Sequence, residues 1–138
     1  MADPTEAIMA ALFTRLAGLS LTPSLPVSWP NLSFSMPADR KALRVVYVPN
    51  TATRRALGSN GAHQYRGLLQ VSVHWPSGQG EAAPRAIASD VADHFPPDLK
   101  LTSGDVTVRI TKRPTVEDMF VDDDGVQIPV MIDWECFY

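Results

Sequence analysis

Apolar and polar side chains alternate along the stretch from Gln64 to Trp75. A period of two over this length predicts a β-strand with one buried face. The face expected inside carries Tyr65, Gly67, Leu69, Val71, Val73 and Trp75. The same alternation recurs at 42–48, 105–113 and 126–138, which predicts three further strands.

Two segments have helical periodicity instead. Apolar residues recur at spacings of three and four from Ile8 to Leu16, after Asp3 as a cap, Pro4 at the first helical position and Glu6 as the end of a capping box. The second helix is expected from about 82 to 95, between the turn 76–80 and the Pro96-Pro97 pair. The order of these elements predicts one α+β domain over 1–138, an antiparallel or mixed β-sheet with two α-helices packed on one face.

The opposite sheet face is expected to be polar. It would carry Arg66, Gln70, Ser72, His74, Thr107, Arg109, Asp133 and Glu135. Such a face is normal for an antiparallel sheet in solvent, and it also suits a wet protein–protein contact.

The segment 49–64 is small, polar and glycine-containing, with a basic pair at Arg54 and Arg55. It is longer than most loops in compact domains, so we expect a mobile, functional arm. The acidic residues Glu117, Asp118, Asp122, Asp123 and Asp124 lie far away in sequence and have the opposite sign. We therefore hypothesise that the basic arm of one subunit approaches the acidic segment of a neighbour.

Composition narrows the function. The chain has 138 residues and a formal net charge of −3, which argues against a general nucleic-acid binder. No apolar run approaches the roughly 18 residues that span a bilayer, and the apolar N-terminal stretch follows acidic residues, unlike a signal peptide. The single cysteine, Cys136, excludes an intrachain disulfide and fits a cytosolic protein with a buried or half-buried thiol.

No segment gives a strong signal for metal binding, nucleotide binding or catalysis. His63, His74 and His94 share no metal-ligand spacing, although Asp90 and His94 are four apart on the second helix and could meet. The consecutive aspartates before Gly125 lack the alternation of a calcium loop and read better as a hairpin turn. The glycines after Arg55 match no nucleotide fingerprint, and no acid, base and nucleophile come together. We expect no cofactor, no metal and no catalysis.

Several short motifs resemble the tail terminator proteins of long-tailed bacteriophages, the group that includes the lambda-type minor tail protein U. They are Leu57-Gly58, Arg66-Gly67 with the strand 68–73, the Pro76-x-Gly78-x-Gly80 turn, the helix with Ala86, Ile87, Ala88 and Phe95, and upstream Trp29-Pro30-Asn31 with Phe34 and Pro37. The resemblance spans most of the chain in order and length, and from about Asp105 it holds only at the level of strands.

The resemblance implies a structural virion protein that forms a closed, hexameric ring. Such a ring caps the tail tube, ends its polymerisation and offers the surface for head–tail joining. The implied partners are further copies, the tail tube protein and a head-completion or connector protein, with no membrane and no sequence-specific nucleic acid, although DNA passes through the ring. Assembly would occur in the host cytoplasm. From the negative net charge we further hypothesise that acidic groups such as Asp133 or Glu135 line a channel, where they would discourage DNA from sticking.

Two alternatives stay open at this stage. One is a head–tail joining or tail-completion protein of related fold. The other is a small-molecule-binding or hydrolytic α+β domain, which would need a concave pocket that holds His74 or His94 beside an acid.

Overall fold

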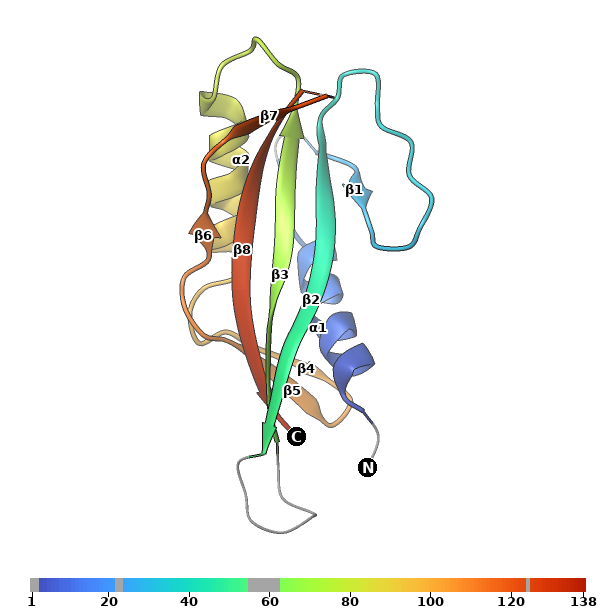
Figure 1. The fold of residues 1–138 in the computed structure, drawn as a ribbon, viewed down its shortest axis with the longest axis vertical. Helices are drawn as coiled ribbons and strands as arrows, with labels where there is room; N and C mark the ends of the chain where they lie inside the picture. The colour runs from blue at the N-terminus through green and yellow to red at the C-terminus, as the bar shows by residue number, and fades with distance from the viewer. Residues whose placement is uncertain (1–2, 22–23, 55–62, 124) are drawn as a thin grey trace.

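The computed structural model describes residues 3–21, 24–54, 63–123 and 125–138, with the backbone alone at 50–54. The elements in chain order are α1 (Thr5–Ala17), β1 (Val27–Ser28), β2 (Ala42–Arg54), β3 (His63–Trp75), α2 (Ala82–Asp93), β4 (Lys100–Ser103), β5 (Val106–Ile110), β6 (Thr115–Val116), β7 (Phe120–Asp122) and β8 (Gly125–Phe137). Both helices lie behind the sheet on one face (Figure 1). The predicted α+β class is confirmed.

The described strands form one mixed sheet in the order β1-β2-β3-β8-β5-β4, and β6 and β7 also pair with β8. Only the short β1–β2 pairing is parallel. Strands β2, β3 and β8 are each 13 residues long and make the centre of the sheet. On one edge of β8 lies β3, and along the other edge come β5, β6 and β7 in turn.

The core fills the space between the sheet and the helices. The inward side chains of the long strands are those that alternation selected, and they meet the apolar stripes of α1 and α2. Its largest fully buried side chains include Trp134, Phe95, Ile8, Leu12, Leu43, Leu69, Ile128 and Ile132. Cys136 is buried as expected, and burial raises the pKa of its thiol.

Gly67 lies where its two neighbouring strands approach it closely. Its pairing partners are Pro49 on β2 and Trp134 on β8, and the β2 register shifts between Pro49 and Thr51. A Cβ placed on Gly67 would lie 2.3 Å from the Val48 carbonyl oxygen and 2.5 Å from Cζ2 of Trp134. The Trp134 ring in turn stacks on Tyr47, with centroids 5.9 Å apart. The glycine is therefore required by the indole that crosses over it.

The two helices are joined by a reciprocal pair of hydrogen bonds, called here the interhelical contact. Arg15 donates from Nε to the His94 carbonyl at 2.9 Å, and His94 Nε2 lies 2.7 Å from the Arg15 carbonyl oxygen. The histidine thus contacts the carbonyl of the other helix, where the sequence suggested Asp90 as its neighbour. The contact gives His94 a structural role between α1 and α2.

Several predicted boundaries were wrong. Strand β2 continues to Arg54 and β3 begins at His63, so the expected loop 49–64 is strand at both ends, and 55–62 lies outside the described residues. Pairing with β3 sustains β2 past Pro49 through the register shift. Strand β5 is shorter than expected, and α2 ends at Asp93.

Strand β4 and the start of α1 also differ from the prediction. Strand β4 was not predicted; it exists because it forms a hairpin with β5, which its short sequence does not signal. Helix α1 begins one residue late, at Thr5, whose N–H donates to Asp3 Oδ1 at 2.8 Å. Gly18 caps its other end.

Candidate interaction surfaces

The sheet face away from the helices is mostly polar, as predicted. Arg66 is exposed on it, and Gln70 donates to the Ser72 hydroxyl at 3.0 Å. Two residues that were expected on an accessible face are buried instead: Ser72 is 2% exposed and His74 is 8% exposed. Of the β3 residues proposed for a contact, Arg66 is therefore the most exposed.

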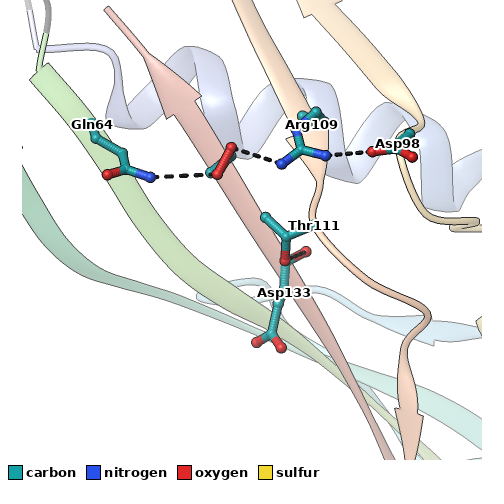
Figure 2. Close-up of polar contacts among 6 residues, drawn as sticks. Gln64, Asp98, Arg109, Thr111 and Asp133 are labelled. Carbon is teal, nitrogen blue, oxygen red and sulfur yellow. Dashed lines mark hydrogen bonds and ion pairs between the residues drawn. The ribbon is translucent and has the colours of Figure 1, made fainter.

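The open face also carries a charged network that joins residues far apart in sequence (Figure 2). Arg109 on β5 donates from Nη2 to Glu135 Oε2 at 3.0 Å and from Nη1 to Asp98. Gln64 donates to the other Glu135 oxygen at 3.4 Å. Glu135 is 7% exposed, so these partners compensate a nearly buried carboxylate. The hydrogen bond to Glu135 is the main cause that raises the pKa of Arg109.

A second ion pair lies beside this network. Lys112 Nζ is 3.1 Å from Asp133 Oδ2, and the Thr111 N–H donates to the Asp133 carbonyl at 3.1 Å. Together the two pairs border a shallow groove of about 490 Å³ on the open face. Both carboxylates expected to line a channel, Asp133 and Glu135, thus have a cation beside them, which leaves less negative charge for that role.

The acidic segment lies on the β6–β7 side of the molecule. Glu117, Asp118 and Asp123 are exposed, and Asp122 accepts a hydrogen bond from Gln127. The predicted hairpin turn is confirmed, because Asp122 pairs with Gly125 across it. Asp124 lies outside the described residues.

The basic pair proposed to meet this segment falls mostly outside the described part of the chain. Arg54 is the last residue of β2, where its backbone pairs with His63, and its side chain is not described. Arg55 is outside altogether. The hypothesis that Arg54 and Arg55 contact a neighbour's acidic segment stays a prediction.

An apolar groove of about 700 Å³ runs between α1 and the segment after β1. Phe13 and Trp29 both line it and pack with ring centroids 5.0 Å apart, and Leu32, which also lines it, is 66% exposed. The sequence marked Trp29-Pro30 as a motif but gave no sign of a groove, since the groove needs the packing of α1 against a segment about 15 residues away.

A hollow of about 350 Å³ lies beside the interhelical contact, and a histidine is among the residues that line it. His94 and Arg15 line it with α1 and β4 residues, and no carboxylate does. His74 lines none of the described cavities. Within the described ranges, no group of three or more His, Cys, Asp or Glu could hold a metal ion. The requirement for the hydrolytic alternative, a histidine beside an acid in a pocket, is thus not met there.

These features define a class: an α+β domain with a charged surface on the open face of its sheet and an apolar groove beside α1. Comparison with known proteins then gives the family. The model of the phage tail terminator proteins matches residues 7–134, and the chain belongs to that family. It is accordingly a structural protein of the bacteriophage tail and a component of the virion.

A solved structure is also similar to this chain. The two are 31% identical, the match covers 96% of this chain and 95% of the other, and the TM-score is 0.78. No curated protein matches. Among the described residues, no helix is long and apolar enough to cross a membrane.

Proposed function

We propose that this protein forms a closed ring, with six subunits expected, that caps the tail tube, ends its polymerisation and provides the surface for head–tail joining. The observation that carries the proposal is the family match over 7–134. The match also favours a terminator over the related head–tail joining or tail-completion role. The proposed partners are further copies, the tail tube protein and a head-completion or connector protein, met in the host cytoplasm.

The distribution of contact surfaces supports a ring. A contact between two different surfaces on one subunit repeats from copy to copy, and the repeat closes into a ring when the rotation permits. The described surfaces are suited to this, because the apolar groove lies beside β1 whereas the acidic segment lies beyond β8 at the other edge of the sheet.

Light scattering and negative-stain microscopy of the purified protein, alone and with tail tube protein, test the ring. We expect six-fold particles and tubes that stop growing once the protein is added. Tubes that elongate equally with and without it, together with a monomeric mass in both preparations, would refute the function.

Charge reversal tests the proposed use of the basic pair. Arg54→Glu together with Arg55→Glu should shift the ring toward monomer, because like charges would then face each other. An unchanged mass would refute this pairing but leave the ring itself in place.

A further inference from the structure

The outward face of α1 carries a stripe of apolar side chains. Met9, Phe13 and Ala17 line the apolar groove on one side of the helix, and Ala10 lines the hollow on the other side. Residues three or four apart share a helix face, so these side chains form one stripe, with the exposed Glu6 at its N-terminal end. Exposed apolar surface that polar residues border commonly marks a protein contact.

A second apolar patch lies on the open face of the sheet. Val46 and Val48 on β2 are each 37% exposed. Val48 pairs with Leu68, and Met131 lies in the row of Val46, across Gln70. Each of the four apolar residues alternates with core residues of its own strand, so all four point away from the helices. The solvent face of an antiparallel sheet is normally polar, which makes this patch a second candidate contact.

The stripe and the patch lie on opposite sides of the same subunit. Both helices are behind the sheet, and the open face is in front of it (Figure 1). A contact between stripe and patch therefore joins the back of one copy to the front of the next. Such a contact between two different surfaces repeats from copy to copy, as a ring requires.

The patch also matches α1 in length. The 13 residues of the helix span about 20 Å. The patch lies between the rows of two arginines on the open face: Arg44 pairs with Ser72, and Arg66 comes earlier on the same strand β3. From the rise of a strand, these two rows are about 20 Å apart. The helix thus fits between the arginines along its whole length.

The charges at the ends of the two surfaces have opposite signs. Arg44 and Arg66 are exposed, and the ion pairs of the described ranges engage other cations. Glu6 is exposed at the start of the stripe, and those ion pairs engage other carboxylates. Charge complementarity of this kind steers association and fixes its register.

From these placements we infer that the outward face of α1 in one copy packs on the apolar patch of the next copy, between Arg44 and Arg66. Glu6 then meets the arginine at its end of the patch. The inference rests on the proposed ring and names the surfaces that build it. Each copy offers one stripe and one patch, so every copy uses both at once.

Crosslinking tests the contact directly. The double variant Ala10→Cys with Val48→Cys is treated with a short bismaleimide after assembly, alone and on tail tubes. We expect a ladder of covalent multimers from this protein and monomers from either single variant. The native Cys136 is 1% exposed and does not compete. Ala86→Cys with Val48→Cys is the matched control, since Ala86 is exposed on α2, and it should stay monomeric.

Substitution gives an independent measurement. Val48→Asp changes an exposed side chain, so the variant should fold, and it should weaken self-association at least tenfold in sedimentation. Val121→Asp makes the same change on β7, where Val121 is 74% exposed, and should leave association unchanged.

A charge swap separates a direct contact from an effect on the helix. Glu6→Arg should also weaken association at least tenfold. Either Arg44→Glu or Arg66→Glu in the same chain should restore it, and the one that does identifies the direction of the helix on the patch. A substitution on the sheet cannot repair a weakened helix N-terminus, so failure of both to restore association contradicts the contact.

The outcomes also distinguish this inference from the proposed function. Six-fold rings that give no covalent ladder, and that form as well with Val48→Asp as with Val121→Asp, overturn the contact and leave the ring intact. Absence of rings, both alone and on tail tubes, overturns the proposed function and the contact with it. A covalent dimer from Val48→Cys alone also contradicts the inference, because it would show that two open faces meet each other.

Discussion

Gly67→Ala should be among the most damaging single-methyl changes in this protein. The added Cβ would lie 2.3 Å from the Val48 carbonyl oxygen and 2.5 Å from Cζ2 of Trp134. The first neighbour is backbone inside a paired strand, and the second belongs to an indole that is 2% exposed. Neither can move without disturbing the sheet or the core.

The magnitude follows from the two contacts. Overpacking a core usually costs about 1–3 kcal/mol. Because both contacts at Gly67 are far below van der Waals separation, we expect the upper end, about 3 kcal/mol. That is a large part of a typical stability of about 5–15 kcal/mol. For a domain of this size it lowers Tm by roughly 10 °C.

Urea denaturation followed by tryptophan fluorescence measures the change, with Gly18→Ala as the matched control. Gly18 has a φ of −81°, and a Cβ there would lie 3.5 Å or more from its neighbours. The control should stay within about 0.5 kcal/mol of the parent. If Gly67→Ala were as stable as Gly18→Ala, the close packing of strand and indole would be refuted.

A second substitution identifies which neighbour dominates. Trp134→Phe removes the indole atom nearest the new methyl group but leaves the Val48 carbonyl in place. In the Gly67→Ala background it should therefore cost less than in the parent, a coupling that a double-mutant cycle resolves. Trp134 Nε1 has no hydrogen-bond partner among the described residues, so the phenylalanine leaves no acceptor unpaired.

Three further predictions concern polar groups. Arg109→Ala should lower the urea midpoint more than Arg113→Ala, because it leaves the nearly buried Glu135 without its cation; equal midpoints would contradict this. His94→Ala should destabilise by about 1 kcal/mol through loss of half the interhelical contact, whereas an unchanged midpoint would show that the contact contributes nothing. Burial raises the pKa of Tyr47 above its ordinary 10.0, so stability should fall above pH 10, where the unfolded phenol ionises first. Tyr47→Phe should lessen the loss between pH 8 and 11, and identical losses in the two proteins would exclude this cause.

Local pattern predicted most of the scaffold. Alternation identified the inward residues of β2, β3, β5 and β8, and helical spacing identified α1 and α2. These signals work because each element must bury one face, and the residues of that face recur with the period of the backbone. Strand β4 was not predicted, because four residues show too little alternation and the strand forms only by pairing with β5.

The contact surfaces were only partly predictable. Arg66 was placed correctly on the open face, but the sequence gave no reason to join Arg109 to Glu135, 26 residues away. His74 alternates with the polar residues of β3 and yet is buried. Neighbouring strands set its exposure, and periodicity contains no information about them.

By itself, the sequence determined which residues form strands and helices, which of their faces are apolar, and the resemblance to tail terminators. Tertiary structure alone decided that β8 takes β3 on one edge and β5, β6 and β7 on the other. It also placed Trp134 over Gly67, and the apolar groove and β7 on opposite sides of the sheet. The physical reason is that strand order and register depend on packing between distant segments, whereas the burial pattern of each segment follows from its own sequence.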